Sequence, residues 1–167
     1  MRKVFYILGY ITDQDAEWMC RIGTRRRVSE GVVMISQGQQ SRSLFFVLDG
    51  TVSVEISGIG EIAELDCGAI FGEMSFIDRR LPSATVRAKQ DCIILELPAE
   101  AVARRLDTDA GFSSRFYRGV ACFLSDRLRA TLDRLNGRPL PAGRNELDLN
   151  TIGDMQNAAT QFDTILK

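Results

Sequence analysis

The sequence contains no histidine, and this absence narrows the chemistry that the protein can perform. Histidine is the commonest general base near neutral pH and the commonest nitrogen ligand of zinc. The sequence also lacks a phosphate-binding P-loop, a dinucleotide-binding fingerprint and a nucleophile elbow, which mark large classes of enzymes. We therefore expect a protein without catalytic residues and without a metal site, not an enzyme.

Cysteines and long apolar runs are also scarce. Cys20, Cys67, Cys92 and Cys122 show neither metal-ligand nor redox spacing, which favours small buried thiols in a reducing compartment. No run approaches the roughly 18 apolar residues of a membrane span, and acidic residues follow the short apolar stretch at 4–11. The net charge of −1 gives no strong attraction to nucleic acid. We expect a soluble, cytoplasmic protein with no membrane contact.

The middle of the chain, residues 24–97, has the pattern of a β-protein. Thr51–Ile56 alternates apolar and polar side chains, which is the period of a half-buried strand. The dipeptide Asp49-Gly50 before it favours a hairpin turn. Further short runs are separated by glycine, and together they indicate a sandwich or jelly-roll barrel of roughly seven or eight strands. The expected strands lie at 24–29, 32–35, 43–48, 51–56, 61–65, 84–88 and 92–97.

Helical patterns lie on both sides of this region. Residues 13–22 predict a short helix that Thr12 or Asp13 can cap. A second helix is expected from Pro98 to Leu106, with proline at its first position. A long helix is expected over 109–136.

The long helix and the end of the chain each carry an apolar stripe. After a proline-containing linker at 137–149, residues 150–167 predict an amphipathic helix that either folds back onto the protein or docks on a partner. The sequence therefore divides into a domain at 1–136, the linker and the terminal helix. The stripes are Phe112, Phe116, Val120, Phe123, Leu124, Leu128, Leu132 and Leu135, and then Ile152, Met155, Ala159, Phe162 and Leu166.

The most specific motif spans residues 71–86. It begins with Phe71-Gly72-Glu73-Met74-Ser75 and ends with Pro82-Ser83-Ala84-Thr85-Val86. This segment resembles the phosphate-binding cassette of the cyclic nucleotide-binding domain family, in which F-G-E, a short turn and Pro-Arg-Ala-Ala-Thr-Val follow one another. The resemblance extends over about residues 10–136. It implies a mainly β fold, a β jelly-roll barrel or double-stranded β-helix, with a short N-terminal helix and C-terminal helices.

The resemblance also implies a ligand, a cyclic nucleotide such as cyclic AMP or cyclic GMP, and no other cofactor. In the family the glutamate, here Glu73, accepts hydrogen bonds from the ribose, and the glycine, here Gly72, lets the backbone approach the ligand. An arginine pairs with the cyclic phosphate. The ligand-binding positions expected here are Phe71, Gly72, Glu73, Met74, Ser75, Pro82, Ser83, Ala84 and Thr85.

Pro82 departs from the family pattern because it occupies the place of the arginine. Proline has neither a charge nor a backbone N–H. Loss of the charged partner of a buried phosphate should cost about 3–5 kcal/mol, or roughly two to four decades of affinity. Ser83 keeps a hydroxyl, and Arg79 or Arg80 could swing inward, although solvated turn charges are the simpler interpretation of both arginines. Without the arginine, Glu73 could also serve only as a cap of a short helix.

The long helix has two expected roles. In the family it covers the pocket as a lid or forms a dimer, and Leu128 and Thr131 lie near the position of a base contact, although core or dimer packing also explains them. We expect a homodimer or a protein partner through 109–136 and 150–167. Bacterial regulators of this family continue with a DNA-reading domain, for which the roughly 30 residues after the helix are too few, so no DNA binding is expected.

Two functions therefore stay open. In the first, the barrel is a regulatory sensor whose ligand shifts the C-terminal helices between two positions. In the second, it is a ligand-free interaction or scaffold module that acts through helical contacts. Pro82 favours the second for cyclic nucleotides, and the retained Gly72, Glu73 and Ser83 favour some ligand.

Overall fold

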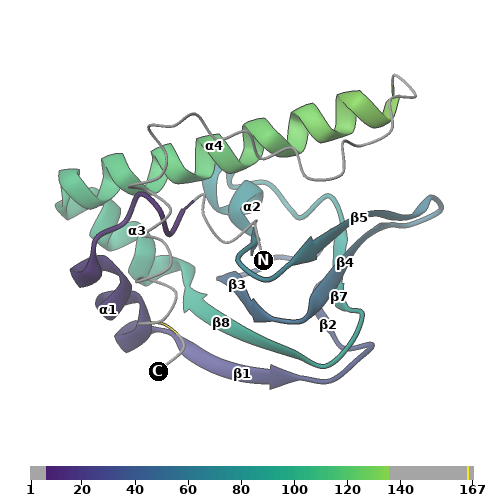
Figure 1. The fold of residues 1–167 in the computed structure, drawn as a ribbon, viewed down its shortest axis with the longest axis horizontal. Coiled ribbons are helices and arrows are strands. Elements are labelled where there is room, and N and C mark those ends of the chain that lie inside the picture. Colours follow the sequence, from purple (N-terminus) through teal and green to yellow (C-terminus); the bar gives the residue numbers. More distant parts are fainter. Residues whose placement is uncertain (1–6, 136–164, 166–167) are drawn as a thin grey trace.

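Two antiparallel sheets of four strands each form the β-barrel, and the helices gather on one side of it (Figure 1). The structure is a computed structural model that describes residues 7–135 and Ile165. The expected linker at 137–149 lies outside the described residues, as does the expected helix at 150–167 apart from Ile165, whose side chain is buried. The mainly β jelly-roll fold with flanking helices is confirmed.

All strand pairs are antiparallel, as the hairpin signals predict. The first sheet has the order β1 (Thr24–Val28), β8 (Cys92–Pro98), β3 (Ser43–Asp49) and β6 (Ile70–Phe71). The second has the order β2 (Val33–Ile35), β7 (Thr85–Ala88), β4 (Thr51–Ile56) and β5 (Gly60–Asp66). Gly50 joins β3 to β4 at a φ of +90°, a conformation that glycine adopts without strain. The residue type at this turn therefore fixes the first hairpin.

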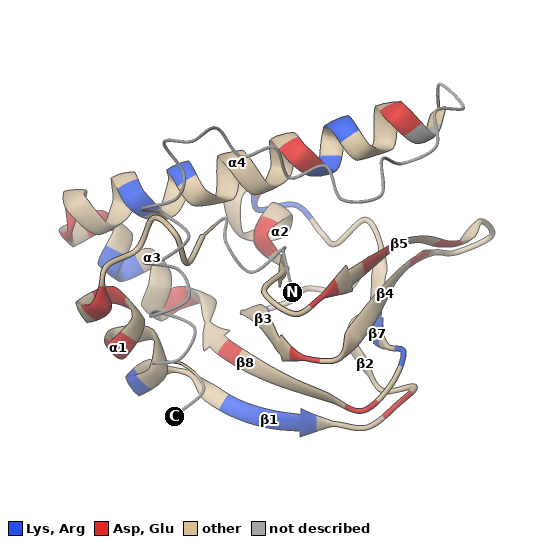
Figure 2. Ribbon diagram, in the orientation of Figure 1, with Lys and Arg blue, Asp and Glu red and all other residues tan. Residues whose placement is uncertain are grey.

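The outer strand of the first sheet, β1, is strongly basic. Arg25, Arg26 and Arg27 follow one another along it and all three are exposed (Figure 2). Arg26 donates a hydrogen bond across to Glu96 on β8, with Nη1 and Oε2 2.5 Å apart. The edge of this sheet thus carries a row of positive charge.

Four helices complete the described fold: α1 (Asp13–Ile22), α2 (Glu73–Asp78), α3 (Ala99–Thr108) and α4 (Ala110–Leu135). Thr12 caps α1 as expected: its side chain accepts from the amide of Asp15, and the Asp15 carboxylate accepts from the amide of Thr12. Pro98 is the cap of α3 and not its first residue, a small correction to the prediction. Across residues 7–135, none of the helices has both the length and the apolarity needed to cross a bilayer.

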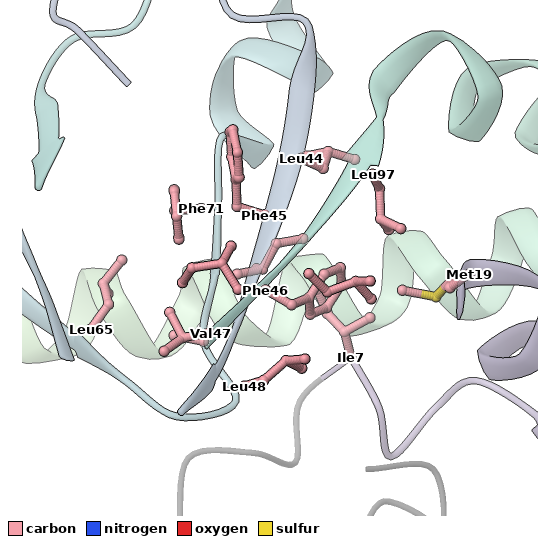
Figure 3. Packing of buried hydrophobic residues seen from close by; sticks show 14 of the residues in the cluster. Ile7, Met19, Leu44, Phe45, Phe46, Val47, Leu48, Leu65, Phe71 and Leu97 are labelled. Carbon is pink, nitrogen blue, oxygen red and sulfur yellow. The ribbon is translucent and has the colours of Figure 1, made fainter. Parts of the chain in front are cut away.

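The core lies on both faces of the first sheet. The run Leu44–Leu48 on β3 is buried throughout, because one face of the strand points into the barrel and the other packs under helices (Figure 3). Phe45 stacks on Phe71 with ring centroids 4.8 Å apart, which joins β3 to β6. On the helix side, α4 contributes Phe112, Phe116, Val120 and Phe123, the first half of its predicted stripe.

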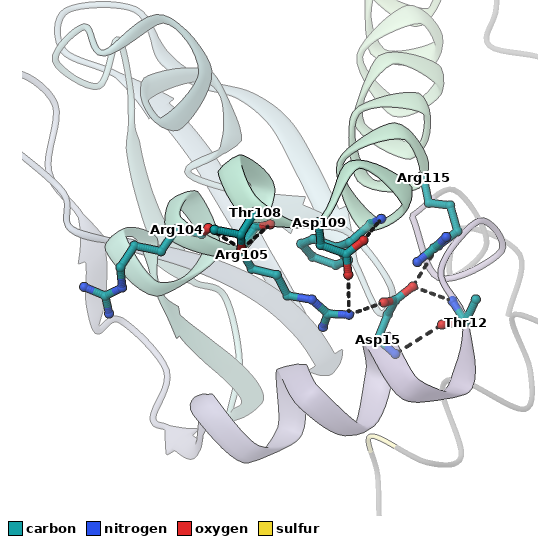
Figure 4. Close-up of polar contacts among 8 residues, drawn as sticks. Thr12, Asp15, Arg104, Arg105, Thr108, Asp109 and Arg115 are labelled. Carbon is teal, nitrogen blue, oxygen red and sulfur yellow. Dashed lines mark hydrogen bonds and ion pairs between the residues drawn. The ribbon is translucent and has the colours of Figure 1, made fainter.

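A buried carboxylate, that of Asp15, ties α1 to the joint between α3 and α4 (Figure 4). Its Oδ1 accepts from Arg105 Nη2 at 2.5 Å, and its Oδ2 accepts from Arg115 Nε at 2.8 Å. Burial opposes ionisation and is the largest single influence on its pKa, but the hydrogen bonds from Arg115 and Thr12 together outweigh it, so the pKa lies below its usual value. The aspartate is therefore ionised and shared between two helices.

Replacing Asp15 with asparagine should destabilise the fold by about 3 kcal/mol at neutral pH, because two arginines lose a charged partner inside the protein. The lowered pKa means that this contribution is present above the usual pKa of an aspartate and is lost as the pH falls through the folded-state value. Urea denaturation should show a large gap between wild type and Asp15→Asn near neutral pH and a smaller gap at acid pH, below the usual pKa of an aspartate. Glu100→Gln, which removes an exposed ion pair with Arg104, is the matched control and should change little. A gap for Asp15→Asn that is the same at both pH values would contradict the expectation.

Candidate functional site

The candidate site begins at Gly72, between β6 and α2. This residue has a φ of +86°, in the region that favours glycine. A Cβ here would lie 2.9 Å from the carbonyl oxygen of Ser43 and 3.3 Å from Cδ1 of Ile35. The position therefore requires glycine for two reasons, its conformation and its closeness to β3. The predicted cassette is held firmly against the barrel.

Glu73, the expected acceptor of ligand hydroxyls, is 2% exposed. Its Oε1 accepts a hydrogen bond from Nη1 of Arg127 at 2.7 Å, and the two form an ion pair. Arg127 belongs to α4, so the pair joins the cassette to the long helix. A second contact joins the same two elements: the rings of Phe76 on α2 and Phe116 on α4 meet edge to face, with centroids 6.1 Å apart.

The electrostatics of Glu73 explain why it needs this partner. Burial raises the pKa of Glu73 above its usual value and outweighs the opposing effects of Arg127 and of nearby backbone amides. A buried carboxylate without a cation would be strongly destabilising. A ligand that donates hydrogen bonds to Glu73 must therefore join this ion pair or displace Arg127 from it.

The second half of the cassette contains no cation at the expected position. Pro82 is buried, and its carbonyl accepts a hydrogen bond from the amide of Gly38 at 2.8 Å. Ser83 is exposed, and the hydroxyl of Thr85 accepts from the amide of Gln37 at 3.1 Å. The β2–β3 loop thus holds this half of the cassette in place through backbone groups.

The two arginines considered as replacements lie on the surface. Arg79 ends α2 with a φ of +58°, and its side chain is exposed. Arg80 is also exposed, and its Nε lies 3.9 Å from the carboxylate of Asp78. No described hydrogen bond or ion pair directs either guanidinium toward Glu73.

The remaining predicted residues are spread over the barrel and α4. Phe71 is buried, and Ser75 and Ala84 are half-buried. The other predicted residues are exposed: Met74 on α2, and Leu128 and Thr131 on α4. The Thr131 hydroxyl donates to the carbonyl of Arg127 at 2.9 Å, within the helix. The structure brings the cassette residues together and leaves the two α4 residues at the surface.

Arg127 was not among the site residues predicted from the sequence. It follows Phe116, Val120 and Phe123 at spacings of four, three and four residues, so it continues their stripe on the inner face of α4. An arginine on a buried stripe needs an anion nearby, and this pattern could have identified it. Its guanidinium also lies over the ring of Phe123, 5.5 Å from the centroid.

A surface cleft of about 240 Å³ lies beside the cassette, and no residue of 71–86 lines it. Ser43 and Ile35, the residues closest to Gly72, belong to its wall. The described residues also contain no cluster of acidic, cysteine or histidine side chains that could hold a metal ion. The full lining is Met34, Ile35, Ser36, Gln39, Gln40, Ser41, Arg42, Ser43, Phe45 and Glu96.

Relatives of this chain are found among curated proteins. Glutaminase 2 of Bradyrhizobium diazoefficiens is 35% identical over 126 residues, a match that covers 74% of this chain and 20% of that protein. Glutaminase 1 of the same organism is 31% identical over 120 residues and is covered to 19%. The chain thus spans about a fifth of the length of the curated relatives that it matches.

Solved structures share the fold. A cyclic nucleotide-binding domain from Methylobacillus flagellatus superposes with a TM-score of 0.71 at 22% identity, covering 87% of this chain and 85% of that one. The Catabolite Activator Protein of Thermus thermophilus gives 0.62 at 24% identity, covering 78% and 61%. The family model described as "Cyclic nucleotide-binding domain" matches residues 25–109, which is 85 of the 167 residues. From this match and the barrel with its cassette, we conclude that the chain belongs to the cyclic nucleotide-binding domain family.

Proposed function

We propose that this chain is a non-catalytic regulatory module that senses a small ligand at Glu73 and that binds cyclic AMP or cyclic GMP only weakly. The ion pair between Glu73 and Arg127 carries the proposal. It places the carboxylate that the family uses for ligand recognition in direct contact with the helix that would report the ligand. Ligand binding at Glu73 and the response of α4 would therefore both act on the contact between Glu73 and Arg127.

The response follows from competition for Glu73. A ribose hydroxyl that donates to the Glu73 carboxylate adds to the bond from Arg127 or replaces it. If it replaces that bond, α4 keeps the Phe76–Phe116 contact but loses its polar one. A ligand that binds one position of α4 more tightly than the other would then shift the population between them. Regulation would then pass through α4 to a protein neighbour.

Weak binding follows from Pro82. In the described structure, Arg127 is the cation paired with Glu73, and position 82 supplies none. A cyclic phosphate would have to rely on backbone amides and on the exposed Ser83. The expected affinity for cyclic AMP or cyclic GMP is in the millimolar range, two or more decades below a site that has the arginine.

One observation favours the alternative, a ligand-free interaction module. The second half of α4 presents large apolar side chains to solvent: Leu128 is 61%, Leu132 48% and Leu135 78% exposed. They recur at four and three residues, the spacing of a helix-pairing seam. A second copy of this chain or another helix would cover them. This role needs no ligand and is compatible with sensing.

A titration of the melting temperature tests the sensor. Cyclic AMP, cyclic GMP and cyclic dinucleotides are each added up to about 10 mM, where a site of 1 mM affinity should stabilise the fold by about 1.4 kcal/mol. That corresponds to a rise of about 4 °C. Glu73→Gln should abolish the rise, and Glu100→Gln, at an exposed site on α3, should preserve it. A flat response of the wild type to every nucleotide would exclude the sensor and leave the interaction module.

Restoring the missing cation tests the weakness attributed to Pro82. Pro82→Arg should tighten binding of cyclic AMP by about a hundredfold, measured by isothermal titration calorimetry. Leu81→Arg is the matched control, since it adds the same charge one residue away at a side chain that is 60% exposed. It should change the affinity less than threefold. Equal affinities for wild type and Pro82→Arg would show that the pocket excludes the ligand for another reason.

Self-association tests the alternative. Leu132→Glu should weaken any homodimer by at least tenfold, because it places a charge in the apolar seam of α4. Ile59→Glu is the control, since Ile59 is 73% exposed and lies in the turn between β4 and β5, outside that helix. Sedimentation velocity over a concentration series gives the dissociation constants. A wild type that stays monomeric at every concentration would point to a different protein as the partner of α4.

A further inference from the structure

The position of α4 over the cassette depends on a very short joint. Helices α3 and α4 are separated by one residue, Asp109. Its backbone amide closes α3 by donating to the carbonyl of Arg105 at 2.8 Å, and its Oδ1 caps α4 by accepting from the amide of Phe112 at 2.8 Å. Because the connection between the two helices is one residue long, contacts that fix this joint also fix the direction of α4.

Helix α1 holds the joint from the outside. Asp15 bonds to Arg105 on α3 and to Arg115 on α4, so one buried carboxylate spans both helices (Figure 4). Arg105 also lies against two rings, with its guanidinium carbon 4.5 Å from the centroid of Trp18 and 4.2 Å from that of Phe112. Trp18 on α1 and Phe112 on α4 meet edge to face, with centroids 5.5 Å apart. The carboxylate and one of the two rings therefore come from α1, and the other ring comes from α4.

The clamped arginine does not satisfy all of its own hydrogen bonds. Arg105 Nη1 is buried and has no hydrogen-bond partner among the described residues. A buried donor without a partner is unfavourable. The arrangement therefore favours the position of the guanidinium over complete hydrogen bonding, as expected of a group that has to hold two helices at a set angle.

The helix converts a small movement at this joint into a large one at the ligand site. Arg115 and Arg127 are 12 residues apart on one helix, or about 18 Å along its axis. A tilt of about 10° at Arg115 would move Arg127 by about 3 Å, which is enough to break its 2.7 Å bond to Glu73. The polar contact at the cassette is thus sensitive to the clamp at α1.

We propose that Asp15 is a positioning residue for the site at Glu73: it fixes the α3–α4 joint so that Arg127 reaches the cassette. The name ligand site for Glu73 rests on the proposed function, whereas the positioning of Arg127 by Asp15 does not. Helix α1 therefore influences the site at Glu73 through its contacts with α3 and α4. The contacts run from Asp15 to Arg115 and along α4 to Arg127 and Glu73.

A purely structural role for Asp15 makes a different prediction. If Asp15 only stabilised the fold, its loss would accelerate exchange at amides that open by global unfolding, as in the core strands β3 and β8, and would leave the local opening of distant elements unchanged. If it positions α4, the far end of α4 and α2 also open more readily, although they are distant from Asp15 in the chain and do not bond to it. The two roles can therefore be distinguished by which amides exchange faster in the variant.

Hydrogen exchange of the ligand-free protein, read by mass spectrometry, makes this separation. In Asp15→Asn, amides of 124–135 and 73–78 should exchange at least tenfold faster than in wild type, in addition to the acceleration of β3 and β8 that the lower global stability causes. Arg115→Gln keeps the hydrogen bond between Asp15 and Arg105. It serves as the milder variant if Asp15→Asn does not fold. The control is Arg26→Gln, which breaks the pair with Glu96 on the barrel and should leave α2 and α4 unchanged. Acceleration in Asp15→Asn that is confined to globally exchanging amides and spares α2 and residues 124–135 would overturn the proposal.

A double-mutant cycle gives an independent readout. Glu73→Gln, Arg127→Gln and their combination are denatured with urea in the wild-type and in the Arg115→Gln background, and the coupling between positions 73 and 127 is compared. The coupling should fall by at least half in the Arg115→Gln background. An undiminished coupling would refute the positioning role. Neither experiment contains a ligand, so a failure to bind nucleotides would remove the proposed function without deciding this result.

Discussion

The buried carboxylate of Glu73 is the constraint on which the arrangement of this domain depends. A carboxylate that is 2% exposed must be paired, and the partner comes from Arg127, 54 residues later in the chain. This pairing requires α4 to cross the cassette at a fixed position and angle. The joint at Asp109, the clamp at Asp15 and the Phe76–Phe116 contact all serve that crossing. The burial of Glu73 in the cassette and the placement of the long helix therefore depend on each other.

The cassette also shows how a fold can outlast part of its ligand chemistry. Gly72 is required by φ and by the closeness of Ser43, so it is kept by the barrel whether or not a ligand binds. Pro82 is buried, and its carbonyl is bonded to Gly38, so the turn closes without an arginine. The geometry of the cassette thus depends on backbone contacts, and the weak binding of a cyclic phosphate that we propose depends on the absence of an arginine at position 82.

The fold was predictable because its signals are local. Alternation in Thr51–Ile56, the turn at Gly50 and the cap at Thr12 each determine structure within a few residues, and the structure confirms them. The site was predictable only in part. Cassette residues are contiguous and could be named as candidates from the sequence, whereas Arg127 meets Glu73 through tertiary packing that no short window contains. The role of Asp15 was missed for the same reason, since its two arginines lie 90 and 100 residues away.

The basic outer strand of the first sheet has a consequence for how copies of this domain can meet. Two β1 strands brought side by side would set Arg25, Arg26 and Arg27 of one chain against the same residues of the other. Like charges facing each other across strands are destabilising, and charged edge strands prevent sheets from joining edge to edge. A symmetric sheet extension through β1 is thereby disfavoured. Self-assembly through this edge is therefore unfavourable, which leaves the helices and the other sheet edges as surfaces through which copies could meet.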